Sequence, residues 1–144
     1  MTDVSDQKLI EIFERTKTIA VVGFSMNPAR PSHYVSAFLR DQGYRVIPVN
    51  PGHAGKEIWG ETIRASLADI DAPVQMVDIF RRPEAVPEVV EAALEHLKGL
   101  ETIWMQLGVM HEGAAEIARA AGVDVVMNRC PKIEIPRLRR QAGA

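Results

Sequence analysis

The feature of this sequence that most limits its fold is the regular alternation of short apolar runs with helical patterns. Residues 18–23, 45–50, 74–79, 102–106 and 124–127 are rich in apolar and β-branched side chains, as expected of strands buried on both faces. Helical spacing of apolar residues separates these runs. Because a parallel connection needs a right-handed crossover, this order favours a mostly parallel sheet of five strands with helices on both faces. The sequence therefore predicts an α/β, Rossmann-like fold.

The segments between these runs carry helix and turn signals. We expect helices at residues 6–16, 33–42, 63–70, 83–97 and 112–121. Ser32 is the expected N-cap of the second helix, and Pro83 is expected in the first turn of the fourth. Pro48 cannot donate to a strand ladder, so it must face away from a neighbouring strand or mark a strand end. Residues 50–60, with three glycines, are expected to form a loop.

The size and composition of the chain predict one cytoplasmic domain over residues 1–144, with an N-terminal helical segment, residues 1–17, packed on it. Of the 144 residues, 47% are hydrophobic and 25% charged, which excludes extended disorder and a disulfide scaffold. Cys130 is the only cysteine, and the N-terminus lacks a secretory pattern. No apolar run approaches the roughly 20 residues of a membrane span. Residues 135–144 are expected to be a solvated basic tail rather than a nucleic-acid site, because no aromatic side chains are interleaved.

The loop after the first predicted strand is the leading candidate for an anion site. Ligands of open parallel sheets bind outside the carboxyl ends of the strands, near the point where the strand order reverses. Residues 23–32 lack both the G-x-G-x-x-G fingerprint and the phosphate-loop motif. They nevertheless lead into a helix N-terminus, which favours an anion, and Ser25, Arg30 and Ser32 add donors. We expect His33 to donate to a ligand oxygen there rather than to transfer protons.

Two features of these loops have alternative interpretations. Pro28 and Pro31 would stiffen any long connection, in which Arg30 could simply be solvated. After the second strand, Asn50 and Pro51 stand where an NAD site usually presents a carboxylate to the ribose. A neutral Asn50 favours a phosphorylated nucleotide other than NAD, whereas a turn built by Asn-Pro accounts for it equally well.

The ends of the third and fourth predicted strands carry further ligand candidates. Arg81 and Arg82 precede a helix, and guanidinium groups suit bidentate phosphate recognition. Phe80 could stack on a base, but a place in the core is the favoured interpretation. Gln106 puts a polar group at the end of a buried strand, and Gly108 lets backbone approach a ligand closely.

The cysteine and the histidines show no catalytic or metal-binding pattern. Arg129 and Lys132 flank Cys130 and would favour its thiolate if they lie close in space. A buried, unreactive Cys130 is nevertheless the favoured interpretation. The four histidines have no metal-ligand spacing with the cysteine or with one another. We therefore predict neither a catalytic residue nor a metal site.

Five motifs, in order along the chain, resemble a known family. They are V-V-G-F-S-x-x-P-x-R-P-S-H, G-Y-x-V-I-P-V-N-P, V-D-I-F-R-R, W-M-Q-x-G-V and R-C-P-K-I-E. From about residue 18 to residue 134, the chain closely resembles the small stand-alone CoA-binding proteins. These are similar to the N-terminal CoA-binding domain of the succinyl-CoA synthetase alpha subunit.

The resemblance implies that coenzyme A binds with its pyrophosphate at the first loop and touches the later strand ends. We place the ribose 3′-phosphate on Arg81 or Arg82 from charge alone. The predicted CoA-binding residues are Gly23, Phe24, Ser25, Arg30, Pro31, Ser32, His33, Asn50, Pro51, Phe80, Arg81, Arg82, Gln106, Leu107 and Gly108.

The resemblance does not extend to ligase chemistry. The synthetase carries its phosphorylated histidine in a second domain and takes its nucleotide on another subunit, and His33 is not a counterpart of that histidine. We expect a non-catalytic protein that binds CoA or acyl-CoA as a sensor or accessory module, with a homodimer or a partner enzyme left open. The alternatives are an enzyme that uses an acyl-CoA substrate through Cys130 or His33, and an NAD-type redox-sensing nucleotide binder.

Overall fold

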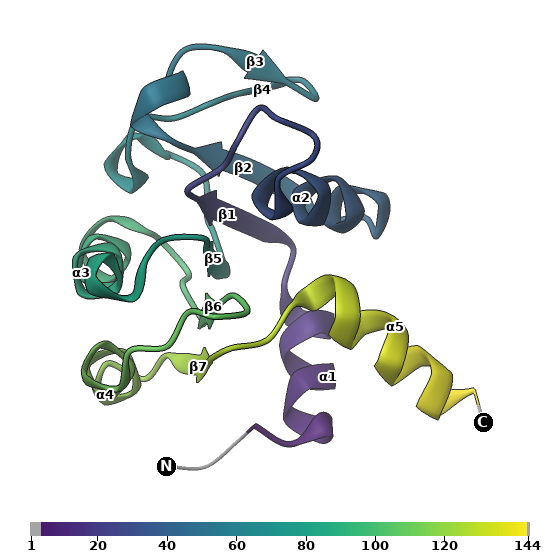
Figure 1. The fold of residues 1–144 in the computed structure, drawn as a ribbon. Coiled ribbons are helices and arrows are strands. Elements are labelled where there is room, and N and C mark those ends of the chain that lie inside the picture. The colour runs from purple at the N-terminus through teal and green to yellow at the C-terminus, as the bar shows by residue number, and fades with distance from the viewer. Residues whose placement is uncertain (1–3, 144) are drawn as a thin grey trace.

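The computed structural model describes residues 4–143, which fold around one central sheet (Figure 1). The strands of this sheet are β1 (Thr18–Val22), β2 (Arg45–Val49), β5 (Met76–Ile79), β6 (Thr102–Met105) and β7 (Asp124–Val126). They lie in the order β2-β1-β5-β6-β7, and every neighbouring pair is parallel. The predicted α/β, Rossmann-like fold with a five-stranded sheet is confirmed.

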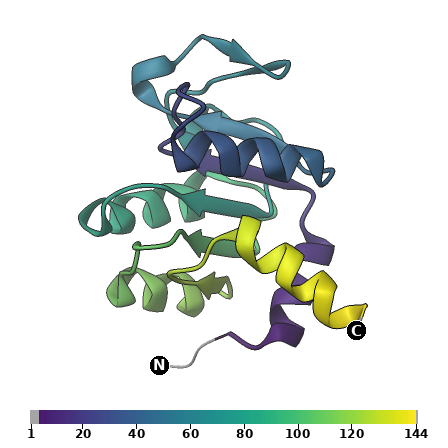
Figure 2. The ribbon, with the colours of Figure 1, turned by 45° about the vertical axis from the view of Figure 1, so that its right-hand side comes forward.

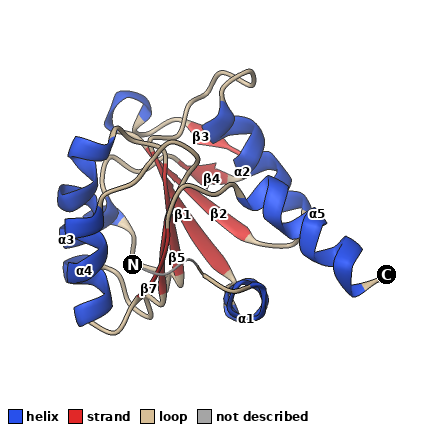
Figure 3. Ribbon diagram, turned by 60° about the horizontal axis from the view of Figure 1, so that its bottom comes forward, coloured by secondary structure: helices blue, strands red, loops and turns tan. Residues whose placement is uncertain are grey.

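Helices cover both faces of the sheet (Figure 3). They are α1 (Asp6–Arg15), α2 (Pro31–Asp41), α3 (Val86–His96), α4 (Glu112–Ala120) and α5 (Pro131–Ala142). α3 and α4 pack on one face with Ala20 and Val77, while α1, α2 and α5 pack on the other with Val21 and Trp104. Because successive strand residues point to opposite faces, both sets of side chains are buried, and the strands read as unbroken apolar runs.

A small hairpin extends beyond the β2 edge of the sheet (Figure 2). It consists of β3 (Glu57–Ile58) and β4 (Glu61–Thr62), which pair antiparallel. The turn between them, Trp59 and Gly60, has φ angles of 53° and 78°. The expected loop over residues 50–60 therefore contains a short 3₁₀ helix, η1 (Pro51–His53), and the first strand of this hairpin.

The predicted helix over residues 63–70 is wrong. Its apolar residues have helical spacing, but Ile63 belongs to the core under α2, whereas Leu67 and Ile70 belong to the opposite core. One helix cannot bury the same stripe on both sides of a sheet, so the chain crosses the sheet edge in a nearly irregular path. Only a 3₁₀ turn, η2 (Leu67–Asp69), forms there.

Two further expectations are corrected by the structure. Ser32 does not cap α2: Arg30 is the N-cap, and the buried Ser32 hydroxyl instead accepts a hydrogen bond from the Ser25 amide at 2.9 Å. The expected basic tail is the helix α5, because Ile135 and Leu138 are buried against the core. One of its cations is also paired. Arg137 donates to both carboxylate oxygens of Asp6 in α1, at 3.0 and 2.8 Å.

A 3₁₀ turn, η3 (Pro83–Ala85), precedes α3. The elements that follow α3 lie close to their expected positions. No helix among residues 4–143 has both the length and the apolar character needed to cross a bilayer.

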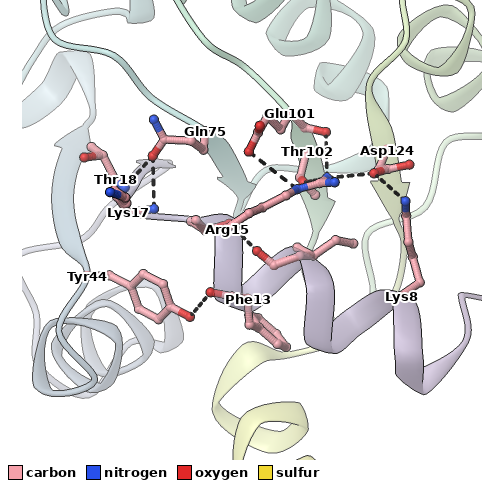
Figure 4. A network of polar contacts seen from close by, with 12 residues as sticks. Lys8, Phe13, Arg15, Lys17, Thr18, Tyr44, Gln75, Glu101, Thr102 and Asp124 are labelled. Atoms are coloured by element: carbon pink, nitrogen blue, oxygen red, sulfur yellow. Dashed lines mark hydrogen bonds and ion pairs between the residues drawn. The ribbon is translucent and has the colours of Figure 1, made fainter.

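α1 is attached to the amino-terminal edge of the sheet by a polar network around Arg15 (Figure 4). The Arg15 guanidinium donates to the Thr102 hydroxyl at 3.0 Å and to Asp124 Oδ2 at 2.7 Å. It also lies 3.4 Å from a carboxylate oxygen of Glu101. Lys8, two helical turns earlier on the same face of α1, pairs with the same Asp124 at 3.2 Å. This network joins α1 to β6 and β7 at the end of the sheet opposite the strand carboxyl ends.

Replacing Arg15 with alanine is expected to lower the free energy of unfolding by about 1–2 kcal/mol, because several hydrogen bonds to one charged group are lost together. Arg119→Ala is the matched control, since it removes a single exposed pair with Glu112 and should cost under about 0.5 kcal/mol. Urea denaturation of both variants checks this. Equal losses in the two variants would mean that the network adds nothing beyond one surface pair.

Candidate functional site

The main cleft of the molecule opens at the carboxyl ends of the strands, where the strand order reverses. From β1 the chain passes through α2 to β2 on one side, and then returns to β5 on the other side of β1. The first residues after β1, β2, β5 and β6 meet at this edge. The cleft has a volume of about 840 Å³, within the range of small-molecule sites.

The residues lining this cleft come from all five strand ends and from two helix N-termini. They are Gly23, Ser25, Arg30, Pro31, Ser32, Tyr34, Val35, Asn50, His53, Phe80, Arg81, Arg82, Pro83, Gln106, Leu107, Gly108, Val109, Cys130, Lys132 and Ile133.

Gly23 sets the close approach of the first loop to the end of β5. Its φ is +89°, and a Cβ placed on it would overlap the carbonyl oxygen of Phe80. The same Cβ would lie 3.3 Å from Cδ of Arg81. Only glycine fits here, because both the backbone conformation and the space exclude a side chain. Glycine at position 23 therefore lets the β1 loop pack against the Phe80–Arg81 segment on the cleft floor.

The β1 loop is organised by its own short polar side chains. The Ser25 hydroxyl accepts from the Asn27 amide at 3.1 Å, and the Asn27 carboxamide accepts from the Ala29 amide at 3.0 Å. His33 turns away from the cleft: its Nδ1 lies 2.9 Å from the Ser25 carbonyl oxygen, and its ring stacks on Phe24. The hydroxyl of Ser32 holds the loop from below, as described above. The loop is thus shaped before any ligand arrives.

Asn50 connects the first two loops of the cleft. Its Nδ2 donates to the Phe24 carbonyl at 2.7 Å, and its Oδ1 accepts from the Gly52 amide at 2.8 Å. Asn50 is also the N-cap of η1. Both polar atoms of its side chain are therefore engaged in holding the two loops together, as the turn-forming interpretation requires.

The electrostatic character of the cleft is strongly positive. Its lining includes Arg30, Arg81, Arg82 and Lys132, and none of the described lining residues is acidic. The N-termini of α2 and α5 both open into it, since Pro31 and Lys132 stand in their first turns. Helix N-termini carry partial positive charge and unpaired N–H groups. Such an arrangement attracts a polyanion.

Apolar side chains also line the cleft. Tyr34, Leu107 and Ile133 line it although 43%, 53% and 52% of their surfaces are exposed. Exposed large apolar side chains that gather in one hollow are typical of ligand sites. The cleft therefore combines cationic and apolar lining residues, which suits a ligand with a charged end and an uncharged arm.

Two smaller hollows continue the cleft along the strand ends. One of about 530 Å³ shares Gly23, Asn50, Phe80 and Arg81 with it and extends towards α3. The other, of about 370 Å³, shares Leu107, Cys130 and Ile133 and extends towards β7. The three hollows thus adjoin one another along this edge of the sheet.

Asp78 lies directly below this edge. It is in the central strand β5, beside Val21 and Trp104, and it shares a face with Phe80 two residues further on. Its side chain is fully buried, and within residues 4–143 neither carboxyl oxygen has a hydrogen-bond partner. Burial raises the pKa of Asp78 well above its ordinary value. A carboxyl in this environment is held protonated.

The structure brings together most of the residues that the sequence predicted. All of them line the main cleft except Phe24, which is buried, His33, which faces Phe24, and Pro51, which lines the hollow towards α3. Phe80 is half-buried and forms part of the cleft wall.

Sequence reasoning missed several lining residues. They are Tyr34, Val35, His53, Pro83, Val109, Lys132 and Ile133. Tyr34, Val35, Lys132 and Ile133 stand in the first turns of helices that follow sheet strands, and that position was the available signal. No group of three or more His, Cys, Asp or Glu within residues 4–143 is placed to hold a metal ion.

An open parallel sheet with a positive cleft at its switch point defines a Rossmann-like ligand-binding domain. The chain belongs to the family described as the CoA binding domain, whose model matches residues 17–136. The family that the five motifs indicated is thereby confirmed.

The relatives of this chain extend over nearly its whole length. It is 40% identical to the uncharacterized protein YneT of Bacillus subtilis over 133 residues, covering 92% of this chain and 96% of that protein. A solved structure from Thermus thermophilus is 41% identical with a TM-score of 0.88, covering 94% of this chain and 99% of that one. A dinucleotide-forming acetyl-coenzyme A synthetase of Ca. Korarchaeum cryptofilum shares the fold, with a TM-score of 0.65 at 20% identity, over 81% of this chain and 27% of that one.

Proposed function

We propose that the chain binds CoA or an acyl-CoA in the main cleft, as a sensor or accessory module without ligase chemistry of its own. One observation carries the proposal: in a member of the CoA binding domain family, a cleft lined by four basic side chains and by no described acidic one lies at the ligand edge of the sheet. CoA is a polyanion at its nucleotide end and uncharged along its pantetheine arm. The cleft combines cationic and apolar lining residues in the same way.

In this proposal the phosphates lie at the N-terminus of α2, where Arg30 and the β1 loop supply donors. Arg81 or Arg82 takes the ribose 3′-phosphate, since two exposed guanidinium groups follow β5 on the cleft rim. The pantetheine arm follows the strand ends past Gln106 towards Cys130. Binding along this path does not require the β1 loop to rearrange, because the loop's own hydrogen bonds already fix its shape.

Thermal unfolding of ligand-stripped protein with CoA, acetyl-CoA, dephospho-CoA, NAD or ATP tests the proposal. At 100 times its dissociation constant, CoA should add about 2.7 kcal/mol, or roughly 5–10 °C for a domain of this size. Dephospho-CoA, which lacks the 3′-phosphate, should add less. In the double variant Arg81→Ala/Arg82→Ala the shift with CoA should fall to that of dephospho-CoA, whereas Arg140→Ala, an exposed change near the end of α5, should leave it unchanged.

Two results would contradict the proposal. No shift with any CoA species would remove CoA as the ligand. A shift with NAD alone would move the redox-sensing alternative to first place.

A further inference from the structure

The main cleft contains a free thiol. Cys130 is the only cysteine of the chain, and it lines the main cleft and the hollow towards β7. It is the N-cap residue of α5, a helix of 12 residues, and makes no side-chain capping hydrogen bond. The nucleophilic form of cysteine is the thiolate.

The cations beside Cys130 differ from the sequence expectation. Arg129 does not serve the thiol alone, because its guanidinium donates to Glu134 at 2.7 Å. Glu134 in turn accepts from Arg137 at 2.8 Å. Lys132 remains on the cleft wall, with its ammonium 5.7 Å from the centre of the Phe38 ring. Of the two cations that flank Cys130 in the sequence, Lys132 is the one on the wall of the main cleft.

A second and independent observation marks the cleft as a ligand site. Gln106 lines the cleft with only 5% of its surface exposed. Within residues 4–143, its buried Oε1 has no hydrogen-bond partner. An unsatisfied buried acceptor costs about 1–3 kcal/mol, and native proteins rarely leave one without a partner. The pantetheine arm of CoA carries amide N–H donors of the type that this oxygen lacks.

We propose that Cys130 is a thiol–disulfide exchange site for disulfides of CoA. The inference rests on the proposed binding of CoA in this cleft. The Cys130 thiolate attacks one sulfur of the CoA disulfide, a bond forms between the two sulfurs, the original sulfur–sulfur bond breaks, and CoA leaves as a thiolate that takes up a proton. The protein thiol is oxidised and one CoA is reduced, so no further oxidant is needed. The product is a mixed disulfide between Cys130 and CoA.

The selectivity of this step for CoA disulfide over other disulfides comes from the cationic residues of the cleft. The cationic residues bind the nucleotide of the CoA disulfide and hold its sulfur near Cys130, which converts the attack into an intramolecular reaction. A disulfide without the nucleotide gains much less from those residues. The limited exposure of Cys130, 6% of its surface, further disfavours reagents that the cleft does not bind.

The test compares two disulfides on the full chain. Reduced protein is mixed with equal concentrations of CoA disulfide or glutathione disulfide, and the mass of the intact protein is followed with time. We expect one CoA adduct, formed at least about tenfold faster than the glutathione adduct because binding supplies proximity. Cys130→Ser should form none. Arg81→Ala/Arg82→Ala should slow the CoA reaction towards the glutathione rate and should change the glutathione rate much less.

A second readout keeps the test independent of how Cys130→Ser folds. Acetyl-CoA has no free thiol and no disulfide, so it should occupy the cleft of the native chain and protect Cys130 from CoA disulfide. Equal rates with the two disulfides, or no protection by acetyl-CoA, would overturn the exchange site. If CoA raises the unfolding temperature and no adduct forms, the exchange site fails while CoA binding stands; if neither occurs, both fail.

Discussion

Gly23→Ala is expected to lower the free energy of unfolding by about 2–4 kcal/mol and to abolish CoA binding. The alanine would pay about 1–2 kcal/mol for a left-handed backbone conformation. It would also force its Cβ into the carbonyl oxygen of Phe80, so the loop or the end of β5 must shift. Neither partner in this overlap is a flexible side chain that could swing aside.

The loss of binding should follow from the same shift. Moving Phe80 displaces Arg81 from the cleft rim, and moving the β1 loop breaks the hydrogen bond from Gly23 to Val49 at 3.0 Å. Because the two loops share the cleft floor, either movement separates the groups proposed to bind the phosphates. Equilibrium dialysis with CoA at low temperature, where the variant is still folded, measures this effect separately from stability.

Gly122→Ala is the matched control for this substitution. Gly122 has φ +83°, close to that of Gly23, but a Cβ there meets nothing within 4 Å. It follows α4 and lies outside the cleft. We expect a loss of about 1–2 kcal/mol from backbone conformation alone and unchanged CoA binding. Similar losses in the two variants would show that the contact with Phe80 imposes no constraint.

The second large effect concerns Asp78 and the pH dependence of stability. Because burial raises the pKa of Asp78 in the folded protein, the native state binds one more proton than the unfolded state at pH values between the ordinary and the raised pKa. The free energy of unfolding therefore falls as pH rises through this interval. Each unit by which the pKa is raised contributes about 1.4 kcal/mol to that fall.

Asp78→Asn should remove this contribution, since a carboxamide of nearly the same shape has no proton to lose. We expect the variant to be more stable than the native chain at pH 8, and the difference between them to shrink by more than about 1.4 kcal/mol on acidification to pH 4. Urea denaturation at several pH values measures both chains. The exposed Asp71→Asn makes the same chemical change without burial and should follow the native profile. Parallel profiles for the native chain and Asp78→Asn would contradict a protonated Asp78.

The fold could be predicted where a local sequence pattern has a single structural explanation. The five strands are buried on both faces, so their apolar runs indicated them directly. The predicted helix over residues 63–70 failed because two separate cores selected apolar residues at helical spacing. The β3–β4 hairpin was missed since its strands have two residues each, too few for an alternating pattern.

The candidate site could be predicted where chain position alone decides which residues face the ligand edge. Residues two or three positions after a strand end, such as Ser25, Arg81 and Gly108, reach the cleft. In the helix that follows the loop, by contrast, packing decides which way a side chain points. His33 is of a residue type that often binds ligands, but its ring stacks on Phe24 and its Nδ1 contacts the Ser25 carbonyl instead. The unsatisfied groups of Asp78 and Gln106 depend on three-dimensional burial, which no local pattern encodes.

The two outer strands of the sheet are each protected against joining a strand of another molecule. At β2, Pro48 offers no N–H, and its carbonyl already accepts from the Arg64 amide at 3.0 Å, while Asn50 donates to the Arg64 carbonyl at 2.9 Å. At the opposite border, β7 has three residues, and Asp124 at its start is bound by Lys8 and Arg15. Short, charged or covered borders resist aggregation through backbone pairing. Self-association of this protein is therefore expected to use side-chain surfaces rather than an extended sheet, which favours solubility at high concentration.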